Sequence, residues 1–279
     1  MKIAIAVING LGSQEQFYSV EFKHLVVEAY QKLGENRSED DFIFQEIYWG
    51  DIVKDKHATL LEKANYKKDL TYMNMRQQVI DVFGASLAYH SKTNSQFYPQ
   101  VSTRISENLN RLSKHRRVDN ETTPLVILAH SFGSVAITNY IYDIQKGRAA
   151  GQYDELSPLE RFDTLAGVIT FGSPLGLFSL ENDKFEKPIA KVGDGLPDDF
   201  KRRVKWLNFY DKDDILAYPL KSLNSAYDNV IDEDVEINVG SATTSWNPAC
   251  HYGYWEDKDF VQPVAHYLSE LMAPHVFWE

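Results

Sequence analysis

Short, unbroken runs of apolar residues, each followed by a turn signal, are the feature that most constrains how this chain folds. Most of these runs are rich in Val, Ile and Leu and lack the polar residues that alternate with apolar ones in a half-exposed strand. This pattern is typical of strands buried on both faces, as in a parallel sheet. We therefore expect strands at residues 3–8, 42–49, 125–129, 168–171 and 204–210.

Amphipathic helical patterns lie between the predicted strands. Apolar residues recur at helical spacing around residues 17–30, 75–87, 101–112, 135–144 and 260–271. Strands that alternate with helices predict an α/β fold, namely a mostly parallel sheet with helices on both faces. Residues 52–98 carry two helical patterns with no strand between them. We therefore expect a helical insertion there, in the role of a cap, within a single domain of residues 1–279.

The charge balance and the single cysteine exclude several classes of partner and location. The chain carries 40 acidic and 29 basic residues, a formal net charge of −11, and it contains no long basic run. Nucleic-acid binding depends on clustered Lys and Arg, so we expect no nucleic-acid partner. No apolar stretch reaches the ~20 residues of a membrane helix, so we expect no stable membrane insertion. Cys250 alone cannot form an internal disulfide, and we expect a cytoplasmic protein. The composition indicates no particular oligomeric state.

A serine lies in a sharp turn between a predicted strand and a predicted helix. Residues 125–134 read Leu-Val-Ile-Leu-Ala-His-Ser-Phe-Gly-Ser, which contains a variant of the motif G-x-S-x-G with Ala129 at the first glycine position. Such a turn exposes the hydroxyl of Ser131 at the top of the sheet, and small flanking residues let strand and helix lie close together without colliding. The backbone N–H of Phe132 would then point at the nucleophile from the helix start. The alternative is an ordinary turn in which Ser131 caps the helix.

The order of residues along the chain limits the candidates for a catalytic base. In folds with this serine turn the nucleophile comes first, then an acid, then a histidine. His251, His266 and His275 follow the last predicted strand. His266 lies in the terminal helical pattern, where packing or surface roles are more common, and His275 lies near the chain end, where fraying is common. His251 lies in a loop that can hold an imidazole over Ser131. The alternative for His251 is a hydrogen-bonded loop histidine.

Three carboxylates follow the last predicted strand, where the acid of such a site belongs. Asp211, Asp213 and Asp214 lie in the turn after Tyr210, whereas the turn after Phe171 contains no carboxylate. Each aspartate could accept a hydrogen bond from imidazole Nδ1–H, fix the tautomer and stabilise the imidazolium. The remaining aspartates would then form a solvated cluster, or one would cap a turn.

This arrangement resembles the α/β-hydrolase superfamily over most of the chain. Two segments near the C-terminus are similar to fungal-type (class 3) triacylglycerol lipases. Asp-Ile-Leu-Ala-Tyr-Pro at 214–219 resembles the acid loop of that family, and His-Tyr-Gly-Tyr-Trp at 251–255 resembles its His-x-x-Tyr-Trp segment. The resemblance implies Ser131 as the nucleophile, Asp214 as the acid and His251 as the base, with Asp211 as the next choice for the acid.

The glycine-rich turn at residues 9–12 departs from the lipase pattern. Asn-Gly-Leu-Gly is similar to the His-Gly-x-Gly turn of other α/β-hydrolases, with Asn9 in place of the histidine. By this analogy the backbone N–H groups of Leu11 and Phe132 form an oxyanion hole. The alternative is a nucleotide-binding turn. It would need the third glycine of G-x-G-x-x-G or a following G-K, which the sequence lacks, so we expect no cofactor.

Two other features suggest a nucleophile or a metal but have simpler explanations. Cys250 stands beside His251, yet a lone cysteine is usually a small buried hydrophobe. The acidic runs at 211–214 and 232–234 lack the spacing of an EF-hand. We therefore expect solvated loops at both runs and no metal site.

The segment at 176–203 mixes apolar and charged residues between two predicted strands. We expect a lid loop here, whose ends lie near the carboxyl edge of the sheet beside the serine turn. Phe178 and Phe185 would face an acyl pocket, and Gly193 and Gly195 would absorb the backbone rotation of opening. The alternative is a static surface loop.

Taken together, the motifs and the resemblance imply a cofactor-independent serine hydrolase. The expected substrate is a small-molecule carboxylic ester, cleaved through an acyl-enzyme as in an esterase or lipase. Within enzymes, the alternative is a thioesterase or acyltransferase with the same triad. From another class, the alternative is a non-catalytic hydrolase-fold protein that binds a ligand or partner. The order of Ser, Asp and His argues against that alternative.

Overall fold

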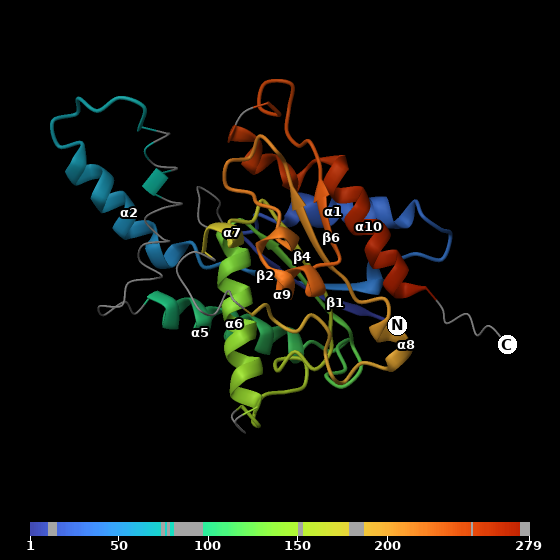
Figure 1. Cartoon of the computed structure of the whole chain (residues 1–279). Coiled ribbons are helices and arrows are strands. Elements are labelled where there is room, and N and C mark those ends of the chain that lie inside the picture. The colour runs from blue at the N-terminus through green and yellow to red at the C-terminus, as the bar shows by residue number, and fades with distance from the viewer. Residues whose placement is uncertain are drawn as a thin grey trace.

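Parallel strands form the centre of the structure, and helices cover them on both faces (Figure 1). The computed structural model describes residues 1–10, 16–73, 76, 79–80, 97–149, 153–178, 187–246 and 248–273. The strands are β1 (Ile3–Ile8), β2 (Phe42–Ile47), β3 (Leu125–His130), β4 (Leu165–Phe171), β5 (Trp206–Tyr210) and β6 (Glu233–Glu236). The α-helices are α1 (Val20–Gln31), α2 (Asp51–Ala64), α5 (Phe97–Ser113), α6 (Phe132–Ala149), α7 (Leu175–Phe178), α8 (Asp198–Lys201), α9 (Ser225–Val230) and α10 (Lys258–Met272). Short 3-10 helices are η1 (Glu39–Asp41), η4 (Lys221–Leu223) and η5 (Pro248–Trp255).

The described strands form one sheet in the order β2-β1-β3-β4-β5-β6, and every neighbouring pair is parallel. Each strand that the sequence predicts is present at its expected place. The predicted fold class, a mostly parallel sheet with helices on both faces, is thus confirmed.

Both faces of the sheet are buried, and β1 shows how. Its odd-numbered residues belong to the core cluster under α1 and α10, and its even-numbered residues to the cluster under α5 and α6. Successive side chains of a strand point to opposite faces. A strand that is covered on both sides therefore needs apolar residues at every position, which explains the unbroken runs in the sequence.

β6 is a strand that the sequence does not predict. The acidic run at 232–234 was expected to be a solvated loop, and that expectation is wrong. β6 lies at the edge of the sheet beside β5. Within it, Asp234 accepts hydrogen bonds from Asn208 Nδ2 and from the backbone N–H groups of Leu220 and Lys221. Short edge strands tolerate charged residues, so hydrophobic patterning does not reveal them.

α2 overlaps residues 52–98, where the sequence predicts a helical insertion. It projects away from the sheet and its covering helices (Figure 1). Asp51 in the first turn of α2 forms a bidentate ion pair with Arg104 of α5, with both N–O distances at 3.0 Å. This pair holds the start of α2 against α5. Most of the second helical pattern, around 75–87, lies outside the described residues. No helix in the part of the chain that the structure describes is long and apolar enough to cross a membrane.

The connection between β4 and β5 returns to the amino edge of the sheet. Gly193 and Gly195 donate backbone hydrogen bonds of 2.8 Å to the carbonyls of Leu165 and Asp163, at the start of β4. A Cβ on Gly193 would lie 2.2 Å from the carbonyl oxygen of Asp163, so this glycine is tightly packed. Adjacent parallel strands require a crossover from one edge to the other. The expectation that these glycines hinge a lid at the carboxyl edge is therefore wrong. Residues 179–186 lie outside the described residues.

Candidate active site

The turn between β3 and α6 holds Ser131 in a backbone conformation that residues with a side chain rarely adopt. Its φ is +51°, in the left-handed region. Its backbone N–H donates to the carbonyl of Phe171 at 3.0 Å, so the turn continues the pairing of β3 with β4. Gly133 lets α6 begin close to the end of β1, because a Cβ there would lie 2.7 Å from the carbonyl oxygen of Asn9. This close approach is the reason that the serine turn needs small residues.

Ser131, His251 and Asp214 lie in one hydrogen-bonded chain. His251 Nε2 is 2.8 Å from Ser131 Oγ, and His251 Nδ1 is 2.8 Å from Asp214 Oδ2. The three residues are 3%, 3% and 2% exposed, respectively. A neutral imidazole in this setting donates Nδ1–H to the carboxylate and accepts the serine proton at Nε2. The structure thus brings together three residues that the sequence selects from turns far apart in the chain.

Asp214 has two further partners besides His251. Its Oδ1 accepts the backbone N–H of Leu216 at 3.0 Å, and its Oδ2 accepts the hydroxyl of Tyr254 at 3.1 Å. Burial and the negative charge of Asp214 raise the pKa of Tyr254. The phenol therefore stays protonated and donates to the carboxylate.

Asp211, the other candidate acid, has a different role in the structure. Its carboxylate accepts the backbone N–H of Asp213 at 2.8 Å and that of Val239 at 2.7 Å. These bonds tie the turn after β5 to the chain after β6. Asp214, and not Asp211, contacts the imidazole of His251.

Cys250 immediately precedes His251 in η5 and is fully buried. Burial, and then the negative charges of Asp211, Asp214 and Asp213, raise the pKa of its thiol to about 12. The thiolate is the nucleophilic form of cysteine, so a thiol with this pKa is unreactive at neutral pH. The nitrogen of His251 that can act as a base faces Ser131 instead.

Gly10 leaves room beside Ser131. A Cβ at this position would lie 2.7 Å from the backbone nitrogen of Phe132 and 3.0 Å from Ser131 Oγ. The turn after β1 and the start of α6 therefore border the same space, where the sequence predicts the N–H of Phe132 as an oxyanion donor. Leu11, the second predicted donor, lies outside the described residues.

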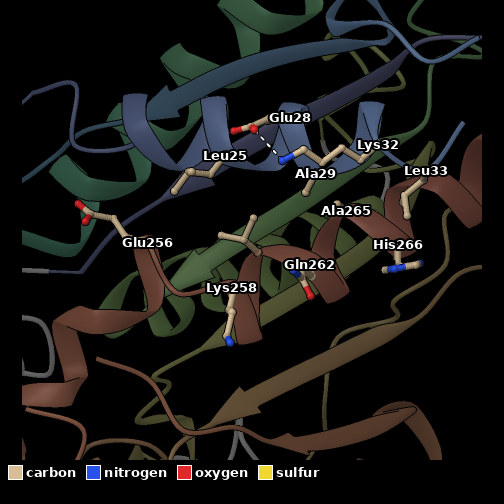
Figure 2. A pocket seen from close by; sticks show the side chains of 11 residues that line it. Leu25, Glu28, Ala29, Lys32, Leu33, Glu256, Lys258, Gln262, Ala265 and His266 are labelled. Atoms are coloured by element: carbon tan, nitrogen blue, oxygen red, sulfur yellow. Dashed lines mark hydrogen bonds and ion pairs between the residues drawn. The ribbon is translucent and has the colours of Figure 1, made fainter. Parts of the chain in front are cut away.

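The other two candidate histidines do not join this site. His266 lies on α10 and lines a groove of about 420 Å³ between α1 and α10, together with the ion pair of Glu28 and Lys32 (Figure 2). Ser131 and Asp214 are not among the residues that line this groove. His275 lies outside the described residues.

Three polar side chains of the site were not selected by the sequence analysis. Asn9 Oδ1 lies 2.7 Å from His130 Nδ1, and the other ring nitrogen of His130 lies 3.0 Å from the carbonyl oxygen of His251. Tyr254 is the third. The sequence contains a signal for each of them, since Asn9 opens the glycine-rich turn, His130 directly precedes Ser131 and Tyr254 belongs to the His-x-x-Tyr-Trp segment.

The acidic runs of the sequence are used in hydrogen bonds within the fold. Asp232 accepts the backbone N–H of Trp206 and pairs with Lys191. Across the described ranges, no group of three or more His, Cys, Asp or Glu side chains is placed to hold a metal ion.

Comparisons with known proteins include a distant structural likeness. No protein-family model matches the chain, and no curated protein matches its sequence. A solved structure from work on LipS and LipT, two metagenome-derived lipolytic enzymes, is similar over 97% of this chain and 93% of the other. The two chains share 11% sequence identity, and the TM-score is 0.40. This likeness is too remote to assign an activity.

Proposed function

We propose that this protein is a serine hydrolase that cleaves carboxylic esters through a covalent acyl-enzyme. The observation that carries the proposal is the hydrogen-bonded chain from Ser131 Oγ through His251 to Asp214, with both distances at 2.8 Å. A binding protein has no need for a serine, a base and an acid in this geometry. The same three roles define acyl-transfer sites on unrelated folds.

In the first half-reaction Ser131 Oγ bonds to the acyl carbon while its proton passes to His251 Nε2. The electron pair of the carbonyl moves to its oxygen and gives a tetrahedral oxyanion. This intermediate collapses, the bond to the alcohol oxygen breaks, and His251 gives its proton to the departing alcohol. Asp214 stabilises the imidazolium that forms between the two proton transfers.

In the second half-reaction water repeats these steps against the acyl-enzyme. Water bonds to the acyl carbon while its proton passes to His251. The second oxyanion then collapses, the bond between the acyl carbon and Ser131 Oγ breaks, and His251 returns its proton to Ser131 Oγ as the acid leaves. We assign the backbone N–H groups of Phe132 and Leu11 to the oxyanion. Donors of this kind each contribute on the order of 3 kcal/mol to transition-state stability. No metal or cofactor enters these steps.

Aromatic side chains beside the serine turn favour an apolar acyl group. The ring of Phe132 lies 5.9 Å from that of Trp49 and 5.3 Å from that of Phe178, centroid to centroid. Such rings are typical walls of small-molecule sites. The segments at 214–219 and 251–255, which are similar to those of class 3 lipases, further support an ester substrate. We assign lipase or esterase activity ahead of thioesterase or acyltransferase activity.

A substrate can reach Ser131 only if neighbouring residues move, because only 3% of Ser131 is exposed. Phe178, at the end of α7, packs edge-on against Phe132, the residue next to the nucleophile. We assign the start of the 176–203 segment to covering the acyl side of the site. Its later glycines have no part in this movement.

The test is a series of p-nitrophenyl esters of rising chain length, hydrolysed by the wild type and by Ser131→Ala. The proposal predicts turnover by the wild type and a loss of roughly 10⁶-fold in kcat for the variant, as when a triad serine is removed elsewhere. Wild-type turnover by a folded Ser131→Ala protein would falsify the proposal.

A further inference from the structure

His130, the last residue of β3, lies at the centre of the site without touching the nucleophile's hydroxyl. Only 1% of it is exposed. Its ring packs against Phe171, Tyr254 and Trp255, with centroid distances of 4.9, 5.8 and 5.3 Å, and lies 4.8 Å from the ring of His251. A polar ring in such an apolar setting is costly unless its nitrogens have partners.

Both ring nitrogens of His130 reach other turns of the site. Nδ1 lies 2.7 Å from Asn9 Oδ1, and Nε2 lies 3.0 Å from the carbonyl oxygen of His251. Asn9 Oδ1 also accepts the backbone N–H of Gly10 at 2.7 Å. One side chain therefore connects the turn after β1, the serine turn and the turn of the catalytic histidine, which meet only in the folded chain.

Histidine suits this place because it is a rigid ring with a nitrogen at each end. Burial, and then the neighbouring His251, hold the pKa of His130 well below its usual range, so the ring is neutral at neutral pH. A neutral ring has a single N–H, so in each tautomer it donates to either Asn9 Oδ1 or the carbonyl of His251, while the other nitrogen only contacts its oxygen. It also places no positive charge beside His251, which must itself become a cation during each proposed catalytic cycle.

The turn after β4 is shaped to admit this ring. Gly172 has a φ of +56°, and a Cβ there would lie 3.0 Å from His130 Nε2. A side chain at position 172 would thus press on the nitrogen that faces His251.

We propose that His130 is a positioning residue, which bridges Asn9 and the backbone of His251 and so holds the imidazole of His251 in line with Ser131. This inference rests on the proposed esterase function. Hydrogen-bond partners behind a reacting group fix its orientation, and a displacement of about 1 Å can lower a rate by 10²-fold.

The test compares His130→Leu, His130→Asn and His130→Gln with the wild type. The amide nitrogen of Asn reaches the place of Nδ1, and that of Gln reaches the place of Nε2, whereas Leu fills the space without a polar atom. We expect kcat for p-nitrophenyl butyrate to fall by roughly 10- to 100-fold in His130→Leu, with KM nearly unchanged. Asn and Gln each keep one contact, so both should retain more activity than Leu.

A second readout avoids any assumption about the natural substrate. The rate at which a fluorophosphonate labels Ser131 should fall in parallel with kcat, because both steps need His251 in line. Asn108→Leu is the matched control. Asn108 is a buried polar residue that bonds Gln45 and the carbonyl of Arg104 away from the site, so its loss should lower Tm and leave kcat unchanged.

Two outcomes overturn the inference while the proposed function stands. One is a folded His130→Leu variant with wild-type kcat and labelling rate. The other is an equal loss in Leu, Asn and Gln variants, which would assign the effect to packing. Loss of folding in all three would leave Gly172→Ala as the deciding variant, in which the ring stays but is displaced. Wild-type kcat in folded Gly172→Ala would then count against a positioning role. Failure of the proposed function itself would be recognised separately, by activity in Ser131→Ala.

Discussion

At the scale of single residues, two neighbouring aspartates of the site have different roles. Asp214 bonds His251, whereas Asp211 bonds backbone N–H groups, including that of Val239. The sequence leaves Asp211, Asp213 and Asp214 as candidates for the acid, because all three lie in the turn after β5. Which carboxylate meets the imidazole depends on how the turn folds, and only the three-dimensional structure provides that.

Exchange of each aspartate for its amide separates these roles. Asp214→Asn should fold normally and lower kcat by about 10³- to 10⁴-fold, because His251 loses the group that fixes its tautomer and stabilises its charged form. Asp211→Asn should lower the free energy of unfolding by about 1–3 kcal/mol through weaker acceptance of its two backbone hydrogen bonds. Its kcat should stay within tenfold of the wild type. Steady-state kinetics and urea unfolding measure both effects, and the reverse ranking of kcat would move the acid to Asp211.

The thiol of Cys250 should be inert in the folded protein. With its pKa raised to about 12, the thiolate fraction at pH 7 is on the order of 10⁻⁵. N-ethylmaleimide should therefore neither label the native protein nor inhibit it, and should react rapidly once urea unfolds it. Mass spectrometry follows the label. Fast labelling of the native protein with loss of activity would contradict the structural role assigned to this cysteine.

At the scale of elements, the regular strands could be predicted from the sequence, and the edges could not. β1 and β3 to β5 are apolar runs because they are buried on both faces, and that pattern is visible in one dimension. β6 has the sequence Glu-Asp-Val-Glu and is held in the sheet by its pairing with β5. A strand held by backbone hydrogen bonds alone needs no regular pattern of apolar residues, so the sequence does not reveal it. The predicted hinge at Gly193 is wrong for a topological reason, because the chain must return to the amino edge of the sheet before β5 begins.

The contacts of His130 show a second limit of the sequence. Its two partners each lie 121 residues away along the chain, in opposite directions. The order of Ser131, Asp214 and His251 could be predicted because a motif and a chain order describe it. No comparable rule describes a side chain that fills the space between the turns.

The prediction for substrate access concerns Phe178 at the end of α7. Phe178→Ser should remove an apolar wall beside Phe132 and lower kcat/KM for long acyl esters by roughly tenfold, with a smaller loss for acetate. The p-nitrophenyl ester series measures the ratio between chain lengths. Leu177→Ser is a suitable control, because Leu177 lies on the same short helix and is 36% exposed. Equal effects of Phe178→Ser and Leu177→Ser on esters of every chain length would show that Phe178 does not line the acyl side of the site.

At the scale of the whole molecule, a buried neutral histidine makes stability depend on pH. The pKa of His130 lies below the ordinary 6.5 in the folded protein, mainly because of burial, with His251 as the nearest titrating group. The unfolded chain therefore binds more protons than the folded one below pH 6.5, and stability falls as the pH falls. This residue accounts for at most about 2 kcal/mol between pH 7 and pH 5. Urea unfolding should show a smaller loss over that range in His130→Gln than in the wild type. Equal losses in the two proteins would contradict a depressed pKa.

The central claim is that Ser131 is the nucleophile of an acyl-transfer site, and covalent capture tests it most directly. The folded wild-type protein is treated with a fluorophosphonate, digested, and analysed by mass spectrometry to locate the adduct. We expect one phosphonyl group per chain, on Ser131, and none on folded Ser131→Ala or after unfolding of the wild type before treatment. An adduct on a different residue of the folded protein, or no adduct at all, would contradict the claim.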